Sequence, residues 1–143
     1  MRKEMQDLLK RYDFCVMATE SDGKPHCSLM AYICDADCRY VYMVTDKKTA
    51  KFRNLKKNPA VSLLVDTRET HGAERRSQTQ ALTVAGVYEP LQEEMIPAIR
   101  DLLLETHPEL SVFLNDPDAR ILSVRLESFL LLDGLTEATY EAV

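Results

Sequence analysis

Hydrophobic and polar residues alternate with two different periods along the first third of the chain. Over residues 2–12 the apolar side chains have helical spacing, which predicts an amphipathic helix. From Phe14 the period changes to two, and Asp22-Gly23 between apolar runs is typical of a hairpin turn. The pattern therefore predicts a helix followed by an antiparallel meander of three strands, at residues 14–19, 26–34 and 38–45.

The rest of the chain adds further strands and two more helices. A short helix is expected within residues 46–57, where Asn58-Pro59 ends it. An amphipathic helix is expected within residues 92–106, and Gly86 before it indicates a β-bulge or a close backbone approach. Strands are predicted at 60–66, 80–89, 119–126 and 128–133, with a long polar connection at 67–79, a short turn at 111–115 and no strong signal in 134–143.

About seven short strands and few helices predict a mainly β fold of the α+β kind, an antiparallel barrel with peripheral helices. The chain has 143 residues, so residues 1–143 are expected to form a single domain. No apolar run approaches the roughly 18 residues of a membrane span, and the N-terminus is not typical of a signal peptide. We therefore expect a cytoplasmic protein that does not associate with membranes.

Positive charge is concentrated in one short segment. The chain has 18 basic and 23 acidic residues, a net charge of −5, yet six basic residues and no acidic one lie within residues 47–57. A strand ends at Thr45 just before this segment, and Asp46 or Thr49 can cap the helix that follows. The N-terminus of a helix binds phosphate, and Lys51 lies in its first turn, so this segment predicts a site for a small phosphorylated ligand. A solvated helix face and a nucleic-acid patch are the alternatives, and the acidic balance of the chain argues against nucleic acid.

The same segment carries a resemblance to a known family. The spacing T-x₃-T-x-K-x₂-N-L-x₂-N-P begins at Thr45 and ends at Pro59, and it follows the strands FCVMAT, CSLMAYI and YVYMVT and the turn SDGKP. Over roughly residues 10–90 the chain resembles the flavin-binding split-barrel family related to pyridoxamine 5′-phosphate oxidase. The resemblance implies an antiparallel six-stranded split β-barrel that forms a homodimer, with flavin mononucleotide (FMN) bound at the interface.

The resemblance also implies a set of residues that bind the cofactor. The FMN phosphate is expected near Thr49, Ala50 and Lys51, and the strand end at Val44 and Thr45 is expected to pass close to the flavin. The second strand is expected to run along the flavin ring through Ser28, Met30 and Tyr32, and Gln80 is expected to make a polar contact. No metal is expected, and the catalytic residues stay unassigned.

The chain departs from pyridoxamine 5′-phosphate oxidases in its substrate-binding parts. It has no Trp, and its C-terminus, LLLDGLTEATYEAV, lacks the Arg-x-His type of motif that these enzymes use. Arg75 and Arg76 in the long polar connection are available cations, but their spacing matches no known motif. The main hypothesis is therefore an FMN-dependent oxidoreductase with a small-molecule redox substrate that stays unassigned. The alternatives are an enzyme acting on a B6 vitamer and a non-enzymatic flavin or haem carrier or sensor.

Cysteine and histidine residues offer weaker candidates. Cys34 and Cys38 flank a tight acidic turn, which is consistent with two small apolar residues at a hairpin tip, a redox-sensitive pair or part of a metal site. His71 and His107 are weak candidate haem ligands, because solvent exposure at His71 and a helix end at His107 already account for them.

Overall fold

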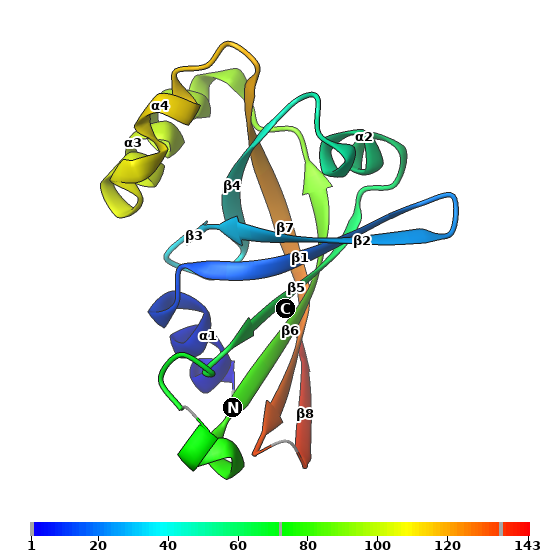
Figure 1. The fold of residues 1–143 in the computed structure, drawn as a ribbon, viewed down its shortest axis with the longest axis vertical. Coiled ribbons are helices and arrows are strands. Elements are labelled where there is room, and N and C mark those ends of the chain that lie inside the picture. The colour runs from blue at the N-terminus through cyan, green and yellow to red at the C-terminus, as the bar shows by residue number, and fades with distance from the viewer. Residues whose placement is uncertain (1, 72, 135) are drawn as a thin grey trace.

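The computed structural model describes residues 2–71, 73–134 and 136–143. Within them the strands form one antiparallel sheet that curls into a barrel, with helices at its margins (Figure 1). The predicted fold class is confirmed, but the sheet has eight strands where six were expected. The strands are β1 (Phe14–Ser21), β2 (Lys24–Ala31), β3 (Ile33–Cys34), β4 (Tyr40–Asp46), β5 (Ala60–Asp66), β6 (Gln80–Glu89), β7 (Ala119–Asp133) and β8 (Glu137–Ala142).

The predicted helices are also present. The α-helices are α1 (Arg2–Arg11), α2 (Ala50–Lys57), α3 (Ile96–Thr106) and α4 (Ser111–Leu114), and the 3₁₀ turns are η1 (Ala73–Gln78), η2 (Glu93–Met95) and η3 (Pro108–Leu110). Pro97 lies in the first turn of α3, where its missing N–H removes no hydrogen bond from the helix. Among the described helices, none is both long enough and apolar enough to cross a membrane.

The short segment between β2 and β3 connects the two ends of the strand order and so closes the barrel. The strand order is β2-β1-β5-β6-β7-β4-β3, with β8 beside β7, so β2 and β3 lie at opposite ends of this order although they are consecutive in sequence. The prediction of one strand at 26–34 was therefore wrong, as was the simple meander. The break falls at Tyr32, whose N–H donates to the Asp13 carbonyl at 2.9 Å and whose hydroxyl donates to the Leu9 carbonyl at 2.6 Å.

The C-terminal third differs from the prediction in two places. The two strands expected at 119–126 and 128–133 are one strand, β7, with a register shift opposite Ala85 and Gly86. A Cβ at Gly86 would lie 2.7 Å from Val124 Cγ1, so the close approach inferred from this glycine is confirmed. The unassigned tail forms β8, which pairs only with β7 and buries neither face, so its sequence lacks the alternation of a half-buried strand.

Strand β4 is buried on both faces and positions the candidate site. Val41 and Met43 point into the barrel core, whereas Tyr42 and Val44 pack against the helices that follow β6. This second cluster contains Ile99, Leu103 and Leu114 from α3 and α4. The end of β4 is thereby held between α4 and α2 (Figure 1).

Candidate functional site

The N-terminus of helix α2 follows directly from the end of β4. Thr49 is the N-cap: its hydroxyl accepts a hydrogen bond from the Phe52 N–H at 3.3 Å and donates to the Asp46 carbonyl at 2.9 Å. Of the two capping residues that the sequence offered, the structure therefore uses Thr49. The Asp46 carboxylate instead accepts the Lys48 N–H at 2.8 Å, which tightens the turn before the helix.

The first backbone N–H groups of α2 stay available to a ligand. Ala50 and Lys51 occupy the first two helical positions, where the helix itself offers no acceptor. Among the described residues, no hydrogen bond uses either N–H group. Beside them, the hydroxyl oxygens of Thr45 and Thr49 lie 3.1 Å apart. The two N–H groups and the two hydroxyls therefore lie together at the positive end of the helix dipole.

A pocket of about 220 Å³ opens at this helix N-terminus. Its walls come from β2, the end of β4, the start of α2, and the η3–α4 segment. Five of the nine predicted cofactor-binding residues line it: Met30, Val44, Thr45, Thr49 and Lys51. The structure thus brings together the two strand ends and the helix start that the sequence placed in one site.

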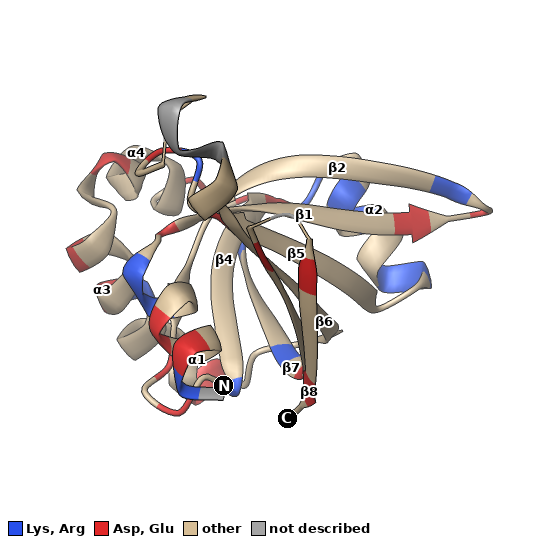
Figure 2. Ribbon diagram, turned by 90° about the horizontal axis from the view of Figure 1, so that it is seen from below, with Lys and Arg blue, Asp and Glu red and all other residues tan. Residues whose placement is uncertain are grey.

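Most of the basic segment is neutralised or faces solvent. Lys47 and Lys48 pair with Asp118, at 3.3 Å and 2.7 Å. The hydrogen bonds from both ammonium groups lower the pKa of the Asp118 carboxyl. Lys56 lies over the Phe52 ring, 4.9 Å from its centroid. Figure 2 shows the basic residues of α2 beside β1 and β2.

Lys51 differs from the other basic residues of the segment. Its side chain is half-buried and lines the pocket, and no acid among the described residues lies within ion-pair distance of its ammonium group. Burial lowers the pKa of Lys51, which shows that the charged form lacks compensation in this environment. An anion in the pocket would supply the missing counter-charge.

Four predicted residues do not line the pocket. Ser28 lies farther along β2, and Ala50 presents only its backbone at the helix start. Tyr32 is buried and points toward α1. Gln80 begins β6 at the end of the barrel away from α2 (Figure 1), and its side-chain amide donates to Glu4 at 3.0 Å.

Five lining residues were not among the predicted cofactor-binding residues: Leu29, Ala31, Asp46, Leu110 and Phe113. Leu29 and Ala31 belong to the strand that was expected to follow the flavin ring, and they lie next to the predicted residues Ser28 and Met30. Leu110 and Phe113 come from a segment more than 60 residues farther along the chain. Only tertiary packing brings this segment to β2, so no local sequence signal marks these residues. In the structure Phe113 is 39% exposed despite its apolar ring, as expected for the wall of a binding site.

The two candidate haem ligands have other partners. His107 is 1% exposed, and its Nε2 lies 3.0 Å from the Tyr32 carbonyl while its Nδ1 lies 3.3 Å from the Glu109 carboxylate. Both ring nitrogens are therefore engaged within the fold. His71 Nδ1 lies 2.8 Å from the Thr67 hydroxyl, and neither histidine lines the pocket at α2. The side chains of Arg75 and Arg76 lie outside the described part of the structure.

The outer face of the sheet is unusually apolar beside this pocket. Cross-strand pairing places one row of side chains across six strands: Leu29, Val16, Leu64, Thr83, Leu130 and Tyr140. Leu29 is 73% exposed and Tyr140 is 65% exposed, and no member of the row is charged. Outward positions of an antiparallel sheet that faces water are normally polar. Leu29 belongs both to this row and to the pocket wall, so the two features are continuous.

Comparisons with known proteins agree with the fold. The sequence profile of the pyridoxamine 5′-phosphate oxidase family matches residues 1–129. No curated protein matches the sequence significantly.

Solved structures share the architecture at low sequence identity. A heme binding protein from Mycobacterium smegmatis superposes with a TM-score of 0.84 at 16% identity, covering 97% of this chain and 56% of that one, so this chain spans little more than half its length. An FAD-binding protein from Mesorhizobium loti has a TM-score of 0.75 at 19% identity, covering 92% and 93%. HutZ, the heme storage protein from Vibrio cholerae, has a TM-score of 0.73 at 19% identity, covering 87% and 89%. At these identities the likeness shows the fold alone.

Proposed function

The chain belongs to the pyridoxamine 5′-phosphate oxidase family, and from this premise we propose that it is an FMN-binding flavoprotein. In this proposal the pocket at α2 holds the cofactor, and the protein exchanges electrons with a small-molecule redox substrate. The observation that carries the proposal is Lys51, a half-buried cation that forms no ion pair with any described residue and lies beside the first N–H groups of α2.

The donor groups fit a phosphate monoester. The N–H groups of Ala50 and Lys51 and the Lys51 ammonium group lie at one helix start, beside the hydroxyl oxygens of Thr45 and Thr49 at the strand end. Charge-assisted hydrogen bonds of this kind are stronger than neutral ones. The Asp46 carboxylate lines the same pocket, but it is already engaged by the Lys48 N–H.

The other walls fit an aromatic ring system. Leu29, Met30 and Ala31 on β2 line the pocket together with Leu110 and Phe113. Cofactor pockets typically combine such apolar walls with a few polar groups that fix orientation. FMN, when bound, supplies hydride and electron transfer, and the protein supplies binding, orientation and exclusion of water. Thr45, Thr49 and Lys51 are therefore binding residues, and no residue of the pocket is proposed as a catalytic acid or base.

We propose that the working unit is a homodimer with the cofactor at the interface. The pocket of about 220 Å³ is smaller than the roughly 300–1,000 Å³ of typical ligand sites, so one chain builds only part of a site. The apolar row from Leu29 to Tyr140 is continuous with the pocket and offers the surface that a second copy would cover. Gln80 lies away from α2 in its own chain, so a contact between Gln80 and the cofactor requires the second copy.

A haem carrier or sensor on the same barrel is the second candidate. It is favoured by the structural likeness to the heme binding protein from M. smegmatis and to the heme storage protein HutZ. His107 argues against it, because both of its ring nitrogens have partners within the fold.

A B6 vitamer as substrate is disfavoured by the absence of Trp. All four cysteines carry thiols, which supports a reducing, cytoplasmic location.

The test is an absorbance spectrum of the purified protein followed by two titrations. FMN is added while quenching of flavin fluorescence is followed, and haem is added while the Soret band is followed. The proposal expects saturable binding of one FMN per chain. A protein that binds haem with one equivalent per chain and leaves FMN fluorescence unchanged would establish the carrier instead.

A further inference from the structure

The tip of the β3–β4 hairpin holds two thiols in contact. Cys34 Sγ donates to Cys38 Sγ at 3.5 Å, across the turn Asp35-Ala36-Asp37. The two sulfur atoms need to approach by only about 1.5 Å to reach the bonding distance of a disulfide. All four cysteines of the chain carry thiols in this structure. The hairpin tip therefore holds a dithiol that is close to the geometry of its oxidised form.

The backbone of the turn fixes this arrangement. The Asp35 N–H donates to the Tyr40 carbonyl at 3.0 Å, the Cys38 N–H donates to the Asp35 carbonyl at 3.1 Å, and the Asp35 carboxylate accepts from two further N–H groups. Cys38 has a φ of 53°, a left-handed conformation that favours glycine. The turn thus carries a cysteine where its backbone prefers a residue without Cβ, and that side chain is turned inward to Cys34.

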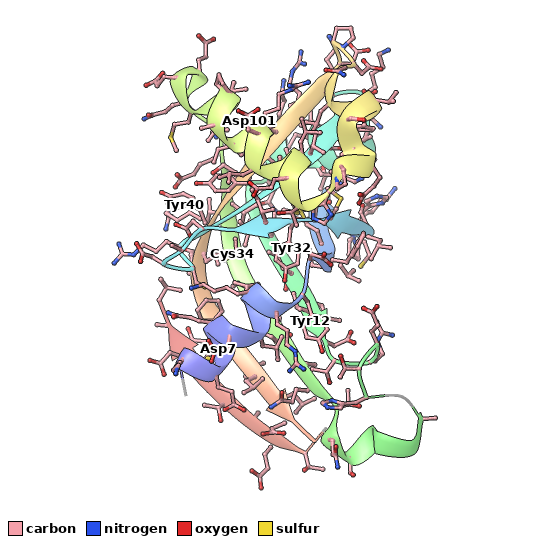
Figure 3. All side chains as sticks on the ribbon, turned by 90° about the vertical axis from the view of Figure 1, so that its left-hand side faces the viewer. Asp7, Tyr12, Tyr32, Cys34, Tyr40 and Asp101 are labelled. Atoms are coloured by element: carbon pink, nitrogen blue, oxygen red, sulfur yellow. The ribbon has the colours of Figure 1, made fainter. Side chains whose placement is uncertain are left out.

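Only one of the two sulfur atoms faces an opening. Cys38 is fully buried, and Cys34 is half-buried and lines a cavity of about 640 Å³ between α1 and α3 (Figure 3). The cavity wall is largely apolar, with Leu9, Ile33 and Ile99 beside Cys34. The cavity shares no lining residue with the pocket at α2. A small uncharged reagent can therefore reach Cys34 but not Cys38.

We propose that Cys34 and Cys38 form a reversible disulfide site that is oxidised by low-molecular-weight disulfides entering through this cavity. The Cys34 thiolate attacks one sulfur of the reagent, forms a mixed disulfide and displaces the first thiol, which takes up the proton that Cys34 lost. Cys38, with its sulfur adjacent, then attacks Cys34 Sγ, and the second thiol leaves with the Cys38 proton. Two cysteines lose two electrons and two protons, and the reagent is reduced to two thiols. The site is independent of the proposed flavin chemistry.

The other two cysteines supply internal controls. Cys15 is buried in the barrel core, where burial raises its pKa to about 12. Cys27 is exposed on β2 and makes no sulfur–sulfur hydrogen bond with another described cysteine. Burial and the neighbouring Cys38 also raise the pKa of Cys34, so its thiolate fraction is small and oxidation takes place slowly.

The test uses the folded full chain with Cys27→Ser, which removes the exposed thiol. The protein is incubated for hours with bis(2-hydroxyethyl) disulfide, then unfolded in acid, alkylated and digested with chymotrypsin. Cleavage after Tyr32 and Tyr40 releases residues 33–40, which contain both cysteines. The expected fragment is unalkylated and lighter by two hydrogen atoms, and dithiothreitol restores the alkylated form. Cys15 is expected to be alkylated throughout.

The variant Cys27→Ser/Cys38→Ser separates the two steps. It is expected to stop at a mixed disulfide on Cys34, because the resolving thiol is missing. The proposal is overturned if fragment 33–40 of the Cys27→Ser protein is recovered alkylated at both cysteines. It is equally overturned if the mixed disulfide persists with Cys38 present, or if the link forms only in denaturant. The measurement on the Cys27→Ser protein decides the matter even where the second variant fails to fold.

Discussion

Lys51 is the residue on which ligand binding depends most in this account. Its side chain is half-buried and lines the pocket, and no described carboxylate lies within ion-pair distance of it, so its charge is available to bind an anion. We expect Lys51→Met to weaken FMN binding by about 1–3 kcal/mol, the scale of a lost charge-assisted hydrogen bond. Fluorescence titration measures this change. Lys57→Met removes the same charge from the exposed last turn of α2 and is expected to leave the affinity unchanged. Equal losses in both variants would mean that only net charge matters.

The same lysine predicts a pH dependence of stability in the ligand-free protein. Burial lowers the pKa of Lys51 in the fold below its ordinary 10.5, so over the interval between the two values the unfolded chain binds more protons. The free energy of unfolding is therefore expected to rise with pH as 10.5 is approached from below. Lys51→Met is expected to remove this part of the rise, and Lys57→Met is expected to retain it. Urea unfolding of the three proteins across the alkaline range measures the difference, and parallel curves would contradict the assignment.

The binding residues that follow one another in sequence were predictable, and the distant ones were not. Thr45, Thr49 and Lys51 lie within seven positions, and a strand end followed by a helix start fixes their relative placement. Leu110 and Phe113 reach the pocket only because α3 and α4 pack on the outer face of β4. No local pattern encodes that packing.

Gly86 lets β6 approach its neighbour β7 closely at the register shift between the two strands. A Cβ at this position would lie 2.7 Å from Val124 Cγ1 and 2.9 Å from the Arg125 carbonyl oxygen, in the buried part of the sheet. We expect Gly86→Ala to destabilise the protein by roughly 1–3 kcal/mol through overpacking. Gly23→Ala is the matched control: its Cβ meets no atom within 4 Å, and only its φ of 76° is unfavourable, so a loss of about 1 kcal/mol is expected. Chemical denaturation compares the two, and a larger loss at Gly23 would show that the close approach at Gly86 relaxes freely.

Most elements that bury apolar side chains were predicted, and the one strand that buries almost none was not. The helices α1, α2 and α3 and the strands β1, β5 and β6 each bury one stripe or face, which leaves a periodic signal in the sequence, and β4 is an apolar run buried on both faces. Strand β8 lies at an edge and buries almost nothing, so its sequence has no period to detect. The polar Glu127 interrupts the pattern of β7, but it falls at the register shift opposite Gly86 and does not end the strand.

At the scale of the whole molecule, the exposed apolar face of the sheet predicts a homodimer. Leu130 lies in the apolar row between Thr83 and Tyr140 and is 41% exposed. We expect Leu130→Lys to weaken dimer formation by roughly 100-fold or more, because a symmetric interface would bury the new charge twice. Light scattering after size-exclusion chromatography measures the mass. Leu102→Lys adds the same charge at an exposed apolar position of α3 outside this face and is expected to remain dimeric. A wild-type protein that is monomeric at all concentrations would refute the proposed interface.

The central claim is that the pocket at α2 recognises a flavin through its phosphate. The most direct measurement is the affinity of the wild-type protein for FMN compared with riboflavin, which has the same ring system without the phosphate. The account predicts that FMN binds at least about tenfold more tightly, since the phosphate contacts at Lys51 and the α2 N-terminus contribute more than about 1.4 kcal/mol. Equal affinity for the two flavins, or no binding of FMN, would contradict it.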